Sequence, residues 1–191
     1  ISGVQRVFIN LCKSFDVLKV KYVINKPFNK LKENDIPIVI GVGKYSLENY
    51  NKNNPIIAGI ALMTHPAEWP NLCNEYPIAK YLQHSNWANN VYKKHYGEKI
   101  CDTWFAGIDT EFWKSNNESK KIDFLVYKKF HWDKDIKTAT LFLPILDYIN
   151  KKGFSYQIIE YGNYLINDYK YLLNKSKYLL LFSEHESQGF A

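Results

Sequence analysis

Polar residues that could take part in chemistry stand directly after expected strands of this sequence or open a helix. They fall in five short stretches: Ser2-Gly3, Thr64-His65, Lys128-Lys129, Tyr161-Gly162-Asn163 and Glu184 to Gly189. Glycine ahead of a helix exposes backbone N–H groups to an anion, and lysine supplies a point charge for phosphate. Histidine can donate to a hydroxyl, and a carboxylate can accept from one. We therefore look for a ligand site at these stretches.

The first half of the sequence alternates apolar runs with helical patterns. Apolar residues at Val4, Val7, Phe8, Leu11 and Phe15 predict one face of a helix that Gly3 opens. Strands are predicted over 36–43, 55–64, 80–83 and 100–108. Between the last two, Ser85 is predicted to cap a helix that ends at a left-handed Gly97. The apolar side of that helix is expected to consist of Trp87, Ala88, Val91, Tyr92 and His95.

The second half repeats this alternation more clearly. Strands are predicted over 122–127, 156–162 and 178–183. One intervening helix carries Leu141, Phe142, Ile145, Leu146 and Ile149 on one side and ends at Lys151, Lys152 and Gly153; the other carries Leu165, Tyr169, Leu172 and Leu173. Strands separated by helices predict right-handed crossovers and a parallel sheet, which binds ligands beyond the carboxyl ends of its strands.

The polar, aperiodic stretch 110–121 predicts a hinge between two domains. We expect an α/β protein with domains over 1–110 and 111–191, and a site in the cleft between them. The sequence has no initial Met, and its first residues read as a loop that enters a helix. A first strand and the C-terminal part of the second domain are therefore expected to be missing.

Composition narrows the class of protein. The apolar runs are too short to span a bilayer, so a soluble protein is expected. Three widely spaced cysteines indicate neither a disulfide framework nor a zinc site, and favour a reducing compartment. The net charge of +6 comes almost wholly from lysine, since Arg6 is the only arginine, and it permits an anionic partner.

Four motifs in this order resemble the group 1, family 4-like, retaining glycosyltransferases. SGVQRVFINL is similar to the glycine loop and first helix of that family's acceptor-side domain. QHSNWANNVYKKHYG and WFAGIDTEFW resemble its Ser-x-Trp helix and its Gly-Ile-Asp turn. SEHESQGFA resembles the start of its Glu-x7-Glu signature. The resemblance implies the GT-B fold, in which two Rossmann-like parallel-sheet domains face a cleft, here 1–110 on the acceptor side and an incomplete donor-binding domain over 111–191.

Sugar transfer leaves negative charge on a departing diphosphate, which fixed cations and N–H groups stabilise. The resemblance implies that Lys128 stands where the family has a catalytic arginine, and that Lys134 or Lys137 stands where it has a lysine. Lysine lacks the bidentate fork of arginine, so diphosphate stabilisation is expected to be weaker. Gly3 is implied to bind the donor through backbone N–H groups.

The resemblance also assigns the residues around the sugar. Glu186 is implied to accept from hydroxyls of the donor, and His65 to lie close to the transferred sugar as the other catalytic residue. The remaining implied donor-binding residues are Gly162 and Asn163, near the nucleobase, with Ser187, Gln188 and Gly189. The implied reaction takes a nucleotide sugar as substrate and a carbohydrate or lipid-linked acceptor. No cofactor and no metal are implied by the resemblance, and the sequence contains no HxxxH motif.

The same resemblance implies polysaccharide biosynthesis in the cytoplasm, with peripheral membrane attachment as a further implication. Two other classes of function stay open. One is a nucleotide-sugar or glycan-binding protein that has lost catalysis, because the expected arginine is absent. The other is nucleic-acid binding, which the scattered cations do not favour, so no nucleic-acid partner is expected.

Each candidate also has a structural alternative. Ser2-Gly3 can be a plain turn, His65 can make a structural hydrogen bond next to Pro66, and the lysines over 128–137 can form a solvated face. The tryptophans Trp69, Trp87 and Trp113 are expected to pack in cores rather than to bind sugar.

Overall fold

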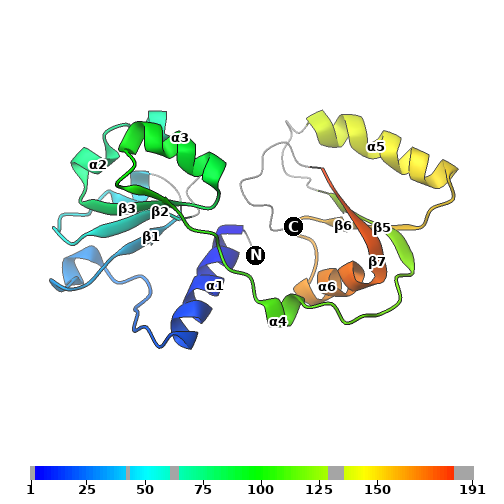
Figure 1. The fold of residues 1–191 in the computed structure, drawn as a ribbon, viewed down its shortest axis with the longest axis horizontal. Coiled ribbons are helices and arrows are strands. Elements are labelled where there is room, and N and C mark those ends of the chain that lie inside the picture. The colour runs from blue at the N-terminus through cyan, green and yellow to red at the C-terminus, as the bar shows by residue number, and fades with distance from the viewer. Residues whose placement is uncertain (1–2, 42–43, 61–64, 129–135, 183–191) are drawn as a thin grey trace. The chain divides into compact units, whose positions relative to one another are not determined.

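The computed structural model describes residues 3–41, 44–60, 65–128 and 136–182. Its helices and strands are labelled in Figure 1. Contacts divide the chain into two compact units, Ile1–Ile108 and Asp109–Ala191. Each unit is built on its own parallel sheet, of four strands in the first and three in the second. The predicted α/β class with parallel sheets is confirmed.

The first unit carries its strands in sequence order. They are β1 (Ile38–Ile40), β2 (Ile56–Ile60), β3 (Ile78–Gln83) and β4 (Cys101–Thr103), arranged β1-β2-β3-β4. The α-helices are α1 (Gly3–Val17), α2 (Leu72–Glu75) and α3 (Asn86–Tyr96), and the short 3-10 turns are η1 (Phe28–Lys30), η2 (Lys44–Leu47) and η3 (Pro66–Glu68).

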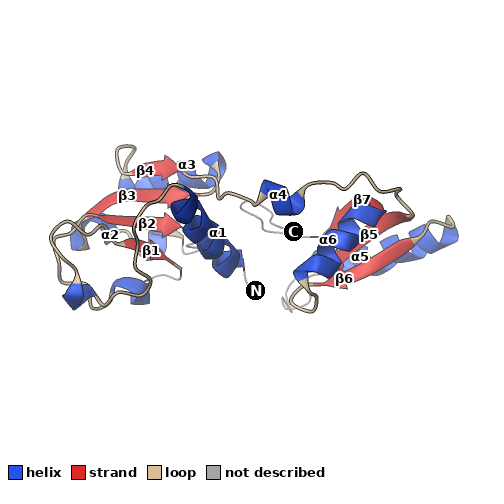
Figure 2. Cartoon of the chain, turned by 90° about the horizontal axis from the view of Figure 1, so that it is seen from below, coloured by secondary structure: helices blue, strands red, loops and turns tan. Residues whose placement is uncertain are grey.

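Helices cover both faces of this first sheet (Figures 1 and 2). On one face, Val7 of α1 packs with Ile60 and Ala106. On the other, α2 and α3 close a larger core in which Ile56 and Tyr81 are at most 1% exposed. Ile56 and Ala58 of β2 belong to the larger core, and Ile57 between them packs against the smaller one, as the alternation of side chains along a strand requires.

The second unit has the order β6-β5-β7, so its first strand lies in the centre. Its elements are α4 (Thr110–Trp113), β5 (Ile122–Lys128), α5 (Ile136–Lys151), β6 (Tyr156–Glu160), α6 (Ile166–Lys175) and β7 (Ser176–Leu181). Helices α5 and α6 lie on opposite faces of the sheet (Figures 1 and 2). The chain passes from β5 through α5 to β6 on one side, and then from β6 through α6 past β5 to β7 on the other side. Right-handed crossovers in these two opposite directions place the two helices on opposite faces.

The predicted helix ends are largely correct. The Ser85 hydroxyl accepts from the Ala88 N–H at 3.3 Å and caps α3. Gly153, with φ +72°, follows α5, and Phe154 N–H donates back to the Ile149 carbonyl at 3.1 Å. Gly97 also has a positive φ of 89°, but its ψ of 154° is extended, so the left-handed helical conformation predicted for it is wrong.

Two predicted apolar faces need correction. Trp87 is 60% exposed and His95 is exposed, because the buried stripe of α3 runs through Ala88, Tyr92 and Tyr96 instead. Trp87 is therefore not a core residue, whereas Trp69 is 6% exposed as expected. Leu165 precedes α6 and is 73% exposed, so it does not belong to the apolar side of that helix.

Several strands are shorter than the apolar runs that predict them. β4 covers three residues of the predicted range 100–108, because it pairs only with Tyr81, Leu82 and Gln83 at the end of β3. β1 likewise covers three residues of 36–43. An apolar run marks buried backbone, but only hydrogen bonding to a neighbour makes it a strand. Residues 61–64 of the predicted strand 55–64 lie outside the described residues.

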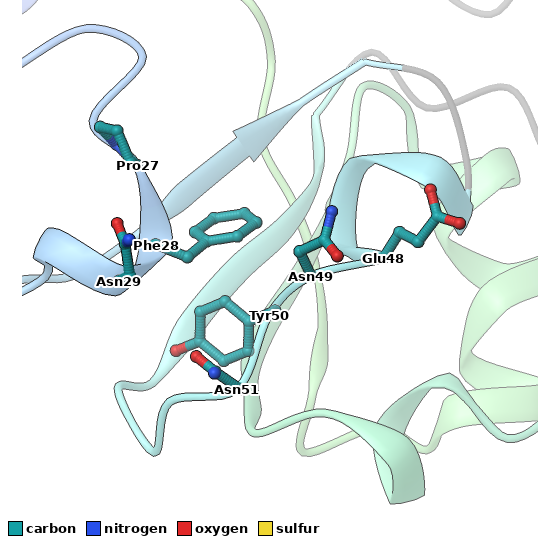
Figure 3. A pocket seen from close by; sticks show the side chains of 7 residues that line it. All are labelled: Pro27, Phe28, Asn29, Glu48, Asn49, Tyr50 and Asn51. Carbon is teal, nitrogen blue, oxygen red and sulfur yellow. The ribbon is translucent and has the colours of Figure 1, made fainter.

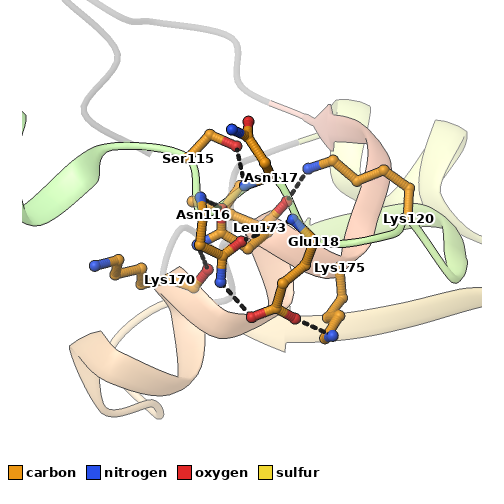
Figure 4. A network of polar contacts seen from close by, with 9 residues as sticks. Ser115, Asn116, Asn117, Glu118, Lys120, Lys170, Leu173 and Lys175 are labelled. Atoms are coloured by element: carbon orange, nitrogen blue, oxygen red, sulfur yellow. Dashed lines mark hydrogen bonds and ion pairs between the residues drawn. The ribbon is translucent and has the colours of Figure 1, made fainter.

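The polar segment between α4 and β5 is bound to the end of α6 (Figure 4). Asn116 N–H donates to the Asn174 side chain at 3.4 Å, and Glu118 pairs with Lys175. The Lys120 ammonium donates to the Leu173 carbonyl at 3.2 Å, at the helix end where a cation is favoured. The segment thus belongs structurally to the second unit.

Across the part of the chain that the structure describes, every helix is too short or too polar to cross a membrane.

Candidate functional site

The predicted site residues are divided between the two units. Gly3 and His65 lie in the first unit, and Lys128, Gly162 and Asn163 lie in the second. Lys137 lies in the first turn of α5. The others, which are Lys134, Glu186, Ser187, Gln188 and Gly189, lie outside the described residues.

Lys128 is the last residue of β5 and has charged and aromatic neighbours. Its Nζ lies 3.6 Å from Oε1 of Glu160, the last residue of β6. The same ammonium lies 5.1 Å from the centre of the Phe142 ring, which α5 places beneath it. With its side chain only 19% exposed, Lys128 is held by a carboxylate and an aromatic face. We call these three residues, together with Phe182, which packs against Phe142, the Lys128 site.

Strand order brings the end of β7 to the same site. Tyr127 pairs with Leu181, so β5 and β7 end side by side. Phe182, which follows β7, lies with its ring 6.0 Å from the Phe142 ring. The chain connects β5 to β6 on one side, whereas β7 lies on the other side of β5. In open α/β sheets, the crevice at the carboxyl ends of two neighbouring strands whose connections run to opposite sides is where ligands bind. The sequence does not reveal this adjacency.

Gly162 and Asn163 lie in a tight turn that joins β6 to α6. Asn163 N–H donates to the Glu160 carbonyl at 3.1 Å, and Gly162 has φ +79°. A type II turn requires a positive φ at its third residue, which glycine adopts without strain. Tyr161 N–H also donates to the Lys128 carbonyl at 2.8 Å. The structure therefore brings this turn next to Lys128 and gives Gly162 a conformational reason to be glycine.

A cluster of tyrosines lies next to this turn. The hydroxyls of Tyr127 and Tyr164 are 3.1 Å apart, and the Tyr169 ring lies 5.2 Å from that of Tyr164. Burial raises the pKa of Tyr127 and of Tyr169 well above the ordinary value, so both phenols are neutral. Sequence reasoning missed this cluster, although Tyr164 stands directly after the predicted site stretch.

His65 makes a structural hydrogen bond next to Pro66, as the structural alternative for this residue predicts. Its Nδ1 accepts from the Ala67 N–H at 3.2 Å and caps η3. The bond requires an unprotonated Nδ1, so a neutral ring carries its proton on Nε2. The exposed ring also lies edge-to-face with His95, with the ring centres 5.8 Å apart. Nε2 is thus the ring nitrogen that remains as a donor.

Gly3 is the first residue of α1, as predicted. No heavy atom lies within 4 Å of the position that a Cβ would occupy there. Packing therefore does not require glycine at this position. Close approach of a ligand, or the backbone conformation with which the chain enters the helix, would be a reason for glycine there.

Sequence reasoning also missed a set of hydrogen-bonded polar side chains at the carboxyl ends of β3 and β4. The Asn89 amide donates to the Thr103 hydroxyl at 3.1 Å, and that hydroxyl donates to the Asn86 side chain at 3.0 Å. Gln83 and His84 at the end of β3 are 5% and 8% exposed. Burial lowers the pKa of His84, against a hydrogen bond with the Trp104 backbone that raises it. The signal was present: Gln83 ends a strand, and His84 and Ser85 directly follow it.

An open hollow lies away from these strand ends (Figure 3). It has a volume of about 580 Å³ and is lined by Pro27, Phe28, Asn29, Glu48, Asn49, Tyr50 and Asn51. The Phe28 and Tyr50 rings meet edge-to-face 5.0 Å apart. The Tyr50 hydroxyl donates to the Asn54 carbonyl at 2.6 Å, just before β2 begins. The hollow is thus at the side where the strands start.

Within the described ranges, no group of three or more His, Cys, Asp or Glu side chains could hold a metal ion. Comparisons of the chain with protein-family models, with curated proteins and with solved structures found no match.

Proposed function

We propose that the chain is the core of a nucleotide-sugar-dependent glycosyltransferase of the GT-B type. It transfers a sugar with retention, and without a metal, to a carbohydrate or lipid-linked acceptor. Its setting is polysaccharide biosynthesis on the cytoplasmic side. Glu186, Lys128 and His65 are its catalytic residues, and Gly3, Lys134, Lys137, Gly162, Asn163 and Ser187 to Gly189 bind the donor.

The observation that carries this proposal is the strand order β6-β5-β7. It sets the end of β5, with Lys128, beside the end of β7, after which the sequence continues as SEHESQG. In this proposal Lys128, at the end of β5, binds the diphosphate, and Glu186, in the sequence that follows β7, binds the sugar hydroxyls. The Glu160 to Asn163 turn, on the other side of β5, supplies a third wall for the nucleoside.

The ion pair of Lys128 makes the proposal testable. The Glu160 carboxylate, 3.6 Å from the Lys128 ammonium, opposes any anion that approaches that cation. If Lys128 binds a diphosphate, Glu160→Gln should strengthen the binding of nucleoside diphosphates by up to about fivefold, since ion pairs near the surface contribute up to about 1 kcal/mol. Lys128→Gln should weaken it by about tenfold, because a charge-assisted hydrogen bond is lost. Calorimetric titration with UDP, GDP and ADP measures both effects.

The matched control is Lys177→Gln. Lys177 pairs with Asp123 at 2.7 Å near the start of β7, at the opposite end of the strands. Removing its charge should leave diphosphate affinity unchanged. Equal losses in the Lys128 and Lys177 variants would mean that only net charge matters, and would contradict the site.

Turnover is tested on the full-length protein with radiolabelled nucleotide sugars. Glu186→Ala should lower sugar transfer and donor hydrolysis by about a hundredfold or more, since a catalytic contact typically contributes that much. Diphosphate affinity should change far less, because the glutamate is assigned to the sugar. Unchanged transfer in Glu186→Ala would remove the assignment.

One observation favours the alternative, a nucleotide-sugar or glycan-binding protein without catalysis. Lys128 replaces the arginine that the resemblance implies, and its ammonium already has Glu160 and Phe142 as neighbours. Tight binding of a nucleotide sugar with no turnover, and none gained in the Lys128→Arg variant, would favour this alternative.

A further inference from the structure

We propose that the hollow between residues 27–29 and 48–51 binds an extended peptide segment of a partner protein, and this inference does not depend on the proposed function. The hollow lies beside the start of β2 in the first unit, and none of its lining residues belongs to the site predicted from the sequence. Its volume of about 580 Å³ falls within the range of sites that take a ligand.

A buried asparagine, Asn54, fastens both walls of the hollow. It is 7% exposed, and its side-chain nitrogen lies 2.7, 3.1 and 2.9 Å from the carbonyl oxygens of Lys32, Glu33 and Asp35, in the turn that follows the first wall. Its own carbonyl accepts from the hydroxyl of Tyr50, in the second wall, at 2.6 Å. Walls that are already ordered lose little further entropy when a ligand binds, so the hollow is preorganised.

Two aromatic rings give the hollow an angled apolar surface (Figure 3). Phe28 and Tyr50 are half-buried, and their rings meet 5.0 Å apart with an angle of 81° between their planes. The ring of Tyr76 packs against Tyr50, with the ring centres 6.4 Å apart. Perpendicular rings form a notch that fits a proline or an aliphatic side chain, whereas a sugar ring stacks on an open, flat ring face.

Three asparagine side chains in the hollow are not used by the fold. Asn29, Asn49 and Asn51 are exposed, and among the described residues none of their amide groups has a hydrogen-bond partner. Figure 3 shows Asn29 and Asn49 on either side of the Phe28 ring and Asn51 beside Tyr50. A side-chain amide carries a donor and an acceptor together, so it can pair with both the N–H and the carbonyl of an extended peptide. Main-chain hydrogen bonds around a notch for one side chain are a recurring mode of peptide recognition.

Charge argues against an anionic ligand in this hollow. Of the described residues that line it, only Glu48 is charged. Lys26, just before the first wall, is paired with Asp35 at 2.5 Å, and Lys30 and Lys52 do not line the hollow. A nucleotide or a nucleic acid would therefore meet a carboxylate instead of the cations that its phosphates require. An uncharged peptide segment meets no such repulsion.

A display library of random peptides, screened against the full chain, tests the proposal. We expect enriched sequences to share one proline or large aliphatic residue as an anchor. Fluorescence polarisation with synthetic copies measures their affinity. Asn49→Ala with Asn51→Ala should weaken binding by about tenfold or more, because hydrogen bonds to the peptide main chain are lost. Asn49→Asp with Asn51→Asp keeps the shape but removes the donors, and should weaken binding at least as much.

Recognition of the main chain is tested independently by changing the peptide. N-methylation of the two residues that flank the anchor removes their N–H donors and leaves every side chain in place. The affinity of the methylated peptide for the wild type should fall by about tenfold. UDP at a saturating concentration should not displace the unmethylated peptide, whether or not the chain is a glycosyltransferase.

The matched control is Asn74→Ala with Asn90→Ala. Both are exposed asparagines, on α2 and α3, and neither lines the hollow. Their removal should change peptide affinity by no more than about twofold, as for surface substitutions outside a binding site. All substituted side chains are exposed, and circular dichroism of each variant confirms that it is folded.

The proposal is overturned if no peptide is enriched, or if enriched peptides bind the Asn49 and Asn51 variants as tightly as the wild type. Unchanged binding of the methylated peptide, or displacement of the peptide by UDP, also overturns it. It is equally overturned if neutral oligosaccharides such as maltotriose bind the wild type and not the Asn49→Ala with Asn51→Ala variant while peptides are not bound.

Discussion

Gly59 in β2 is a residue whose identity is fixed by a neighbouring backbone. Its φ is +88°, and a Cβ at this position would lie 2.6 Å from the Leu82 carbonyl oxygen and 2.8 Å from the Leu82 nitrogen of β3. The Gln83 side chain also donates to the Gly59 carbonyl at 3.0 Å. Glycine in a strand interior marks such close approaches. The pairing of β2 and β3 therefore depends on it.

Gly59→Ala should lower the free energy of unfolding of the first unit by about 4 kcal/mol, because backbone strain and a steric clash add. Gly97→Ala is the matched control. Gly97 has φ +89° but no atom within 4 Å of its Cβ position. It should therefore cost only the strain, about 1 to 3 kcal/mol. Urea unfolding followed by circular dichroism measures both, and equal losses would show that the contact with Leu82 has no cost.

At the scale of elements, Asp123 joins all three strands of the second sheet where they begin. Its carboxylate accepts from the Lys177 ammonium of β7 at 2.7 Å. It also accepts from the N–H and the hydroxyl of Ser155, which precedes β6, both at 2.9 Å. Asp123 N–H returns a hydrogen bond to the Ser155 hydroxyl at 3.0 Å. The strands are thus aligned by side chains at one end as well as by their backbone pairing.

These hydrogen bonds, first of all that of Lys177, lower the pKa of Asp123 from 3.8 to about 2. Because the folded pKa lies below the unfolded one, the carboxylate stabilises the unit fully above the unfolded pKa, and this stabilisation is lost as the pH falls toward 2. Asp123→Asn should lower the stability of the second unit at pH 7 and flatten its loss of stability between pH 4 and 2.

The control for this prediction is Asp147→Asn. Asp147 forms an exposed pair with Lys151 one turn along α5, with the two side chains 61% and 72% exposed. Such pairs contribute little, so stability at pH 7 should change only slightly. Thermal unfolding scans at a series of pH values give the comparison. An Asp123→Asn variant with the wild-type pH profile would contradict the prediction.

At the scale of the whole molecule, the two units have separate cores. Leu125, Tyr127, Ile159 and Tyr169 form that of the second unit, while Ile56, Leu72 and Tyr81 lie in the main core of the first. Separate cores predict separate cooperative transitions. Scanning calorimetry of the chain should resolve two, of which Gly59→Ala lowers one and Asp123→Asn lowers the other. A single transition that both variants shift would show that the units unfold together.

Much of the fold could be predicted from local sequence. The alternation of apolar runs with helical spacing gives parallel α/β units, and Ser85 and Gly153 mark helix ends by interactions within a few residues. These signals can be recognised in the sequence because a helix cap or a helix face depends on residues only three or four positions apart. The sequence likewise pointed to Lys128 and to the Tyr161 to Asn163 turn as strand-end residues.

Tertiary structure alone decided how these pieces meet. The order β6-β5-β7 sets Lys128 beside Phe182, and it also gives Lys128 a carboxylate neighbour in Glu160. In the first unit, packing leaves Trp87 and the large apolar side chains of residues 17–24 facing solvent, although their apolar character suggests burial. The reason is that strand order and burial depend on pairing between segments dozens of residues apart, and no spacing within a segment records which partner it will find.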